Sequence, residues 1–279
     1  MNFKIVSDSC CDLHDDFEMM QGVDFTTVPL TITVGEQNFV DNPQLDVSQM
    51  IKAMKEAPGP SSTACPSPED FAREFRKAPA TFAVTLSSKL SGTYNSAMIA
   101  KNMVLEEDPQ KKIHVVDSLA ASTGQSLLVL KLRDYILASE HSFESIVDKI
   151  EKYRDSLSVR FMLQSFDNLI KAGRMSKLAG VFAHALSIRP ICGDNGKGEI
   201  KIYEKVRGAR NALNRLADMI GEQCPQGKPI MISHCNNPED ASFIKEALQR
   251  LYAPAEVQIL KMRGLSAYYA GEKGIIVSY

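Results

Sequence analysis

The chain has 279 residues, more than the commonest single-domain size, so we expect two α/β domains. Its composition, 44% hydrophobic and 24% charged, excludes a disordered chain and is typical of a globular protein with a substantial core. A formal net charge of -2 provides no overall field that would attract nucleic acid or an anionic membrane, so neither is an expected partner.

The N-terminal residues predict a strand rather than a basic segment followed by a long apolar stretch, so we expect a cytoplasmic protein. No apolar run approaches the roughly 20 residues that a membrane-spanning helix needs, and stable membrane insertion is not expected. A lipid ligand would therefore have to be carried inside the fold.

Three segments of the first half share one design, in which a short apolar strand leads into a loop and then a helix. The strands are predicted at residues 3–6, 82–86 and 113–116, and helices at residues 93–107 and 119–138. Loops that follow parallel strands meet at one edge of a sheet, where ligands bind. Between the first two units, residues 25–33 and 37–40 predict a β-hairpin around Gly35-Glu36, and residues 58–63 predict a loop.

The second half is predicted to form a separate sheet. We expect an N-terminal α/β domain over residues 1–155, with a Rossmann-like parallel sheet, and a C-terminal α/β domain over residues 156–279, with a mixed sheet. A helix at residues 143–153 precedes this boundary. Strands are predicted at residues 160–166, 188–192, 199–204, 230–234, 257–262 and 275–278, and helices at residues 207–223 and 238–251.

Several motifs that would identify an enzyme are missing. The sequence contains no phosphate-binding Gly-x-x-x-x-Gly-Lys-Ser/Thr loop, no dinucleotide fingerprint, no His-Glu-x-x-His and no Gly-x-Ser-x-Gly elbow. Its five histidines are scattered, so we expect no metal and no cofactor. The six cysteines fit neither a zinc site nor a disulfide framework and are interpreted as reduced, mostly buried thiols. A redox role for the Cys10-Cys11 pair is the alternative.

The strongest candidate site is Ser91-Gly92-Thr93, between a buried strand and the start of a helix. The first amides of a helix lack intrahelical partners and favour an anion. Ser91 or Thr93 could instead be the N-cap of this helix. Two further serines in the same loop, Ser87 and Ser88, exceed what one cap requires, and the loop that ends at Thr63 supplies a second cluster of hydroxyls.

These residues belong to an ordered set of segments that resembles the DegV family. The set runs from residue 6 to residue 234 and so covers most of the chain, although no single motif in it is decisive. Its members are Val6-Ser7-Asp8-Ser9, Ser62-Thr63-Ala64-Cys65-Pro66-Ser67-Pro68-Glu69-Asp70-Phe71, Leu86-Ser87-Ser88-Lys89-Leu90-Ser91-Gly92-Thr93-Tyr94, Val116-Asp117-Ser118, Lys171-Ala172-Gly173-Arg174-Met175-Ser176-Lys177 and Ile232-Ser233-His234.

The resemblance implies two α/β domains that bury a long-chain fatty acid and present its carboxylate to a separate ATP-dependent kinase, which forms an acyl phosphate. By this similarity, Thr63 and Ser91 match the positions that hydrogen-bond the carboxylate, and Arg174 matches an arginine at the mouth of the site. The protein would then be a lipid carrier rather than an enzyme. We expect it to be a monomer. Burial of about sixteen carbons would contribute on the order of 10 kcal/mol before ordering costs.

The chain departs from the family pattern at two places. Ala64 stands where a serine is common, and Tyr269 takes the place of a histidine that lies near the head group. A tyrosine hydroxyl donates a hydrogen bond but is not cationic at neutral pH. We therefore expect binding to be affected less than phosphorylation.

Other interpretations of the same residues remain open. Arg174 could be a surface cation beyond a helix that stops at Gly173, and Asp117 is interpreted as a helix cap, whereas Asp8 fits a cap and a functional role equally. Ser91 could be the nucleophile of an esterase-like hydrolase with His234 as base, although His234 alone fits a structural histidine better. A protein-interaction module with an empty cleft is a third possibility. Five apolar residues of the second half are assigned to the core rather than to a tunnel wall: Phe161, Met162, Leu163, Leu186 and Ile188.

Overall fold

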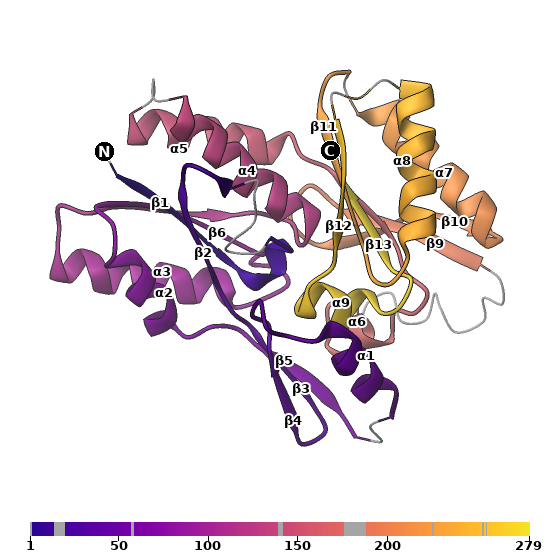
Figure 1. The fold of residues 1–279 in the computed structure, drawn as a ribbon, viewed down its shortest axis with the longest axis horizontal. Helices are drawn as coiled ribbons and strands as arrows, with labels where there is room; N and C mark the ends of the chain where they lie inside the picture. The colour runs from indigo at the N-terminus through magenta and orange to yellow at the C-terminus, as the bar shows by residue number, and fades with distance from the viewer. Residues whose placement is uncertain are drawn as a thin grey trace.

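The computed structural model describes residues 2–13, 20–56, 59–138, 142–175, 188–224, 226–252, 254 and 256–279. Within them the chain forms a parallel four-stranded sheet, a mixed six-stranded sheet and a small antiparallel sheet (Figure 1). The predicted α/β class, with a parallel sheet in the N-terminal part and a mixed sheet in the C-terminal part, is confirmed.

The parallel sheet has the strand order β2-β1-β6-β7. Its central strand β6 is buried at all six positions because helices cover both faces. Helices α2 and α3 cover one face, and α4 and α5 cover the other (Figure 1). The bounds are β1 (Phe3–Asp8), β2 (Asp24–Val28), β6 (Ala80–Thr85), β7 (Lys112–Asp117), α2 (Pro68–Phe75), α3 (Thr93–Glu107), α4 (Thr123–Leu137) and α5 (Phe143–Asp155).

The mixed sheet has the order β10-β9-β8-β13-β11-β12, in which only β11 and β12 run parallel. Helix α7 packs on the β8–β10 side and α8 on β11 and β12. The bounds are β8 (Val159–Met162), β9 (Ile188–Asp194), β10 (Ile200–Arg207), β11 (Pro229–His234), β12 (Glu256–Lys261), β13 (Ile275–Ser278), α7 (Ala209–Gln223) and α8 (Pro238–Tyr252).

The small sheet, in the order β4-β3-β5, packs against α1 and α9 at the bottom of the view in Figure 1. The short helix α6 also contacts α9. The bounds are β3 (Thr31–Val34), β4 (Gln37–Val40), β5 (Ser61–Ala64), α1 (Val47–Glu56), α6 (Asp167–Lys171) and α9 (Gly264–Ala270), and a short 3-10 helix, η1, covers Ser9–Cys11.

Helix α4 connects the two large sheets. It contacts β1 and β6 of the parallel sheet and also β11 and β13 of the mixed sheet. Every residue from Thr123 to Leu130 is buried, which matches a helix with protein on both sides. All strands of the parallel sheet precede residue 155 and all strands of the mixed sheet follow residue 156. The domain boundary at this position stays a prediction.

The structure corrects several predicted elements. The strand predicted at residues 25–33 is interrupted at Pro29, so that β2 joins the parallel sheet and only β3 forms the hairpin with β4. Part of the predicted loop at residues 58–63 is strand β5, which pairs with β3. The helix predicted from residue 119 begins at Thr123, because Leu119 and Ser122 have φ angles of 52° and 55°. Helices α1, α2 and α9 were not predicted, and α6 was anticipated only through the helix stop at Gly173.

None of the helices in the described part of the chain is long and apolar enough to span a membrane.

Candidate functional site

A largely apolar cavity lies where the loops after β6 and β7 meet the mixed sheet, α6 and α9. It has about 910 Å³ of empty volume, a figure that includes the part open to solvent, and most of its lining is apolar. Its wall includes Leu30, Leu86, Leu90, Leu169, Leu265 and Ile276. The wall is therefore suited to an apolar ligand.

Two residues assigned to the core from the sequence also belong to this wall. Phe161 and Leu163 are buried in the core cluster and line the cavity. Met162 points to the core beneath α7 and α8 and Ile188 lies half-buried in β9, whereas Leu186 lies outside the described residues. Phe161 and Leu163 are therefore core residues, as assigned, and they also form part of the cavity wall, whereas Met162 between them faces the opposite side.

Four of the six predicted ligand-binding residues line the same cavity, although they come from distant parts of the sequence. Thr63 comes from β5, Ser91 from the loop before α3, Arg174 from the turn after α6, and Tyr269 from α9. Gly92 lines an adjoining hollow that also contains Ser91 and Arg174. Thr93 is buried and lines neither.

Four hydroxyl side chains in or next to the cavity form two pairs. Ser91 Oγ lies 2.9 Å from Thr93 Oγ1, and Thr63 Oγ1 lies 2.9 Å from Tyr269 Oη. Each pair has two hydroxyl protons and needs one of them for its internal hydrogen bond. One proton per pair is left to donate to a ligand, which suits a group with two acceptor oxygens such as a carboxylate.

Helix α3 begins without a side-chain cap. Its N-cap is Gly92, and the N-cap residue makes no side-chain hydrogen bond, so the prediction that Ser91 or Thr93 could be the N-cap is wrong. Ser91 Oγ accepts only a long bond, 3.4 Å, from the amide of Thr93. An uncapped helix start favours an anion in front of it.

A specific turn directs Arg174 to the cavity. Helix α6 ends at Lys171, and Gly173 has a φ of 79°, as the helix stop predicts. The amides of Gly173 and Arg174 donate to the carbonyls of Ile170 and Leu169, which is the Schellman arrangement. Arg174 Nε then donates to the carbonyl of Leu90 at 2.9 Å, and Nη1 donates to that of Ala172. The guanidinium is thus anchored beside Ser91.

The structure does not support the esterase-like alternative. His234 ends β11 and lines a different hollow from Ser91. Its Nδ1 accepts the amide of Asn237 at 3.1 Å, and burial lowers its pKa. Ser91 bonds Thr93 instead of a base. His234 therefore has the structural role that its sequence context favoured.

Both aspartates of the predicted loops support the fold. Asp8 caps η1 by accepting the amide of Cys10, and it also accepts the amide of Leu86 at 2.7 Å. Asp117 does not cap a helix, because α4 begins after Ser122; it accepts the amides of Ser88 and Leu119 and so holds the turns around the cavity.

The six cysteines are free, as predicted, and Cys10, Cys11, Cys192 and Cys235 are buried. Burial raises the pKa of Cys11 to about 12 and that of Cys10 well above its usual value. Both thiols are therefore protonated at neutral pH, which disfavours the redox alternative. Among the described residues no cluster of His, Cys, Asp and Glu could hold a metal ion.

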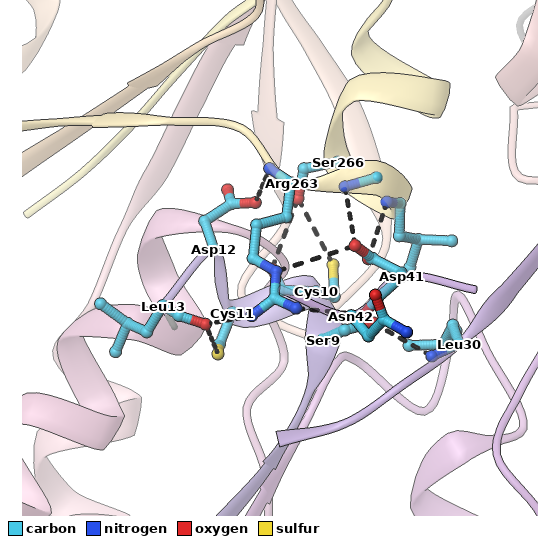
Figure 2. Close-up of polar contacts among 12 residues, drawn as sticks. Ser9, Cys10, Cys11, Asp12, Leu13, Leu30, Asp41, Asn42, Arg263 and Ser266 are labelled. Atoms are coloured by element: carbon cyan, nitrogen blue, oxygen red, sulfur yellow. Dashed lines mark hydrogen bonds and ion pairs between the residues drawn. The ribbon is translucent and has the colours of Figure 1, made fainter. Parts of the chain in front are cut away.

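The sequence did not reveal a buried polar network that adjoins the cavity. Asp12, Asp41 and Arg263 are at most 3% exposed and lie close together (Figure 2). Ser122 and Ser266 line the cavity, and Ser122 bonds Asp12. An acidic residue after a strand, as at Asp41, was the one available signal. This signal could not have identified Arg263 as the partner of Asp41, because the two residues are 222 positions apart in the sequence.

Asp12 should make the protein less stable as the pH rises. Burial raises the pKa of Asp12 to about 7, although Ser122 and the amide of Arg263 donate to its carboxylate. The folded state thus holds a proton between about pH 4 and pH 7 that the unfolded state has lost, so the free energy of unfolding falls over this window, by up to about 4 kcal/mol.

We expect Asp12→Asn to remove most of this dependence. The free energy of unfolding of the delipidated protein is measured with urea at pH 5 and at pH 7.5. The difference between the two pH values should be about 2–3 kcal/mol smaller in the variant than in the wild type. The amide of asparagine imitates the protonated carboxyl and keeps an acceptor for Arg263. An unchanged pH dependence would show that Asp12 titrates normally.

The whole chain matches known proteins. Residues 2–279 match the family model described as "Uncharacterised protein, DegV family". A DegV domain-containing protein of Streptococcus pneumoniae is 37% identical over 279 residues, which cover 100% of this chain and 99% of the relative.

Two solved structures of such proteins carry fatty acids. The Fatty Acid Kinase (Fak) B3 protein of Streptococcus pneumoniae, loaded with linoleic acid, has a TM-score of 0.95 and 37% identity, covering 100% of this chain and 99% of that one. A DegV family protein of Ruminococcus gnavus, refined with vaccenic acid, has a TM-score of 0.93 and 34% identity, with full coverage of both chains. The match over the entire length shows that this chain belongs to the DegV family.

Proposed function

We propose that this chain is a fatty-acid-binding carrier, which buries one long acyl chain in the cavity and holds its carboxylate at Ser91 and Thr63. The observation that carries the proposal is the combination of an apolar cavity with two hydroxyl pairs and one guanidinium at its wall. Tail burial provides the affinity, and the hydroxyls fix the orientation of the head group. The fatty acids in the related structures support this assignment.

The six predicted residues take different parts in the proposed site. Ser91 donates to one carboxylate oxygen, and Thr63 or Tyr269 donates to the other. Thr93 orients Ser91 through the bond of 2.9 Å, and Gly92 exposes the free amides of α3. Arg174 stands next to the head group, where its positive charge favours an anion.

The carrier is proposed to act with a separate ATP-dependent kinase that converts the carboxylate into an acyl phosphate. The adjoining hollow, which contains Lys89, Gly92 and Arg174, supports this step because it opens the head-group end toward a partner. Such a kinase uses cytoplasmic ATP, so we place the carrier in the cytoplasm, as a monomer. No specific observation favours the hydrolase alternative.

Mass spectrometry of the denatured protein tests the carrier function. Washed preparations from a bacterial host should contain about one fatty acid of 16 to 18 carbons per chain, and added linoleic acid should replace it. Repeated preparations that contain no fatty acid and take up none would contradict the proposal.

A further inference from the structure

The side chain of Asp41, which follows β4, caps a helix that begins more than 220 residues later. Its Oδ1 accepts the amide of Gly264 at 2.8 Å, and its Oδ2 accepts the amide of Leu265 at 2.9 Å. These are the first two residues of α9. Figure 2 shows Asp41 at the start of this helix. Because the four first amides of a helix lack intrahelical partners, Asp41 fixes where and in which direction α9 begins.

Arg263 reinforces this cap. Its Nη2 donates to the carbonyl of Asp41 at 3.1 Å, and its Nε lies 3.7 Å from Asp41 Oδ1. Nη1 donates to the carbonyl of Leu13, and the backbone amide donates to Asp12 at 2.8 Å (Figure 2). The loop before α9 is thus tied to two segments of the N-terminal part.

The other end of α9 carries two tyrosines that face the small sheet. Tyr268 Oη lies 2.8 Å from Ser61 Oγ, and Tyr269 Oη lies 2.9 Å from Thr63 Oγ1. The two rings pack edge to face with centroids 4.8 Å apart. Strand β5 therefore contacts the C-terminal end of α9, while Asp41, just after β4, binds its N-terminal end, so the position of Tyr269 beside Thr63 depends on both contacts.

A buried ion pair is seldom the most stabilising choice, because removing two charges from water costs much of what their attraction provides. Asp41 and Arg263 are 1% and 3% exposed, and a pair of apolar residues could fill the same space. Apolar residues, however, cannot accept hydrogen bonds from two helix amides at defined positions. The geometry thus favours orientation of α9 as the role of this pair.

We propose that Asp41 is a positioning residue for fatty-acid recognition: through α9 it holds the Tyr269 hydroxyl against Thr63, so that this hydroxyl pair faces the carboxylate. The inference rests on the proposed carrier function and adds a residue that does not line the cavity itself. Its consequence is that Asp41 acts on ligand affinity through Tyr269.

A double-mutant cycle on the full chain tests this coupling, with linoleic acid as the probe. Asp41→Ala and Tyr269→Phe should each weaken linoleic acid binding about 5- to 10-fold, and the double variant should bind about as weakly as either single variant. Binding of linoleyl alcohol, which has no carboxylate, should change less than about 2-fold in all three.

Two further variants separate positioning from general stability. Asp41→Asn keeps one acceptor oxygen, so it should bind linoleic acid more tightly than Asp41→Ala does. This variant still tests the positioning role if Asp41→Ala folds poorly. Asp46→Ala is the matched control, because Asp46 caps α1 in the neighbouring segment: its side chain accepts hydrogen bonds from the amides of Ser48 and Gln49 rather than from amides of α9. It should leave linoleic acid binding unchanged.

The two proposals fail in different ways. If the losses of affinity from Asp41→Ala and Tyr269→Phe multiply in the double variant, the positioning role is overturned. It is also overturned if the variants lose equal affinity for linoleic acid and for linoleyl alcohol. In both cases the carrier function stands. A wild-type protein that binds no linoleic acid would overturn both.

Discussion

Replacing Ile276 with tryptophan should weaken the binding of 18-carbon fatty acids by about 2–3 kcal/mol, or roughly 30- to 150-fold in Kd, because the indole takes the space of three or four methylenes. Ile276 lines the cavity from β13, the strand between β8 and β11. Its backbone pairs with Phe161 and Ser233 on the two sides, so the strand should stay in place. Fatty acids of ten to twelve carbons should lose much less affinity.

Titration of the delipidated protein with saturated fatty acids of increasing length measures this shift. Ile99→Trp is the control of equal size, since Ile99 is exposed on α3 and does not line the cavity. The chain contains no native tryptophan, so the introduced indole of each variant also reports binding by its fluorescence. An equal loss for all chain lengths would mean that the tail does not pass Ile276.

Replacing Ser91 with alanine should weaken the binding of a fatty acid by about 1.5–3 kcal/mol, or roughly 10- to 150-fold, since a hydrogen bond to a charged acceptor is lost. The alcohol of the same length has no carboxylate, so its affinity should fall much less. The ratio of the two affinities therefore isolates recognition of the head group from burial of the tail.

Ser88→Ala provides the matched control for this measurement. Ser88 lies in the same loop and is exposed, and its contact with Asp117 is made by the backbone amide rather than by the hydroxyl. The Ser88→Ala variant should bind both the fatty acid and the alcohol with wild-type affinity. Equal losses for acid and alcohol in Ser91→Ala would show that Ser91 shapes the cavity and does not recognise the carboxylate.

The parts of the fold that the sequence predicted are those with strong local signals. Apolar strands followed by polar loops identified β1, β6 and β7, and the helix stop at Gly173 was visible because its positive φ requires a residue such as glycine. The resemblance to the family then selected Thr63, Ser91, Arg174 and Tyr269, which the structure brings to one cavity.

Elements that depend on distant partners could not be predicted in this way. Helix α9 has only seven residues, and its cap comes from Asp41, 223 positions before Gly264. Strand β5 is rich in serine, which has a low preference for strands, and forms because β3 offers it an edge. Helix α2 is different, since the capping box between Ser67 and Asp70 was a local signal that sequence interpretation overlooked.

A crystal structure of the protein loaded with linoleic acid tests the central claim most directly. We expect the tail to fill the cavity along Phe161, Leu163 and Ile276. We also expect carboxylate oxygens within about 2.5–3.2 Å of Ser91 Oγ and of the hydroxyl of Thr63 or Tyr269. A carboxylate at another end of the cavity, or an acyl chain bound outside it, would contradict the account.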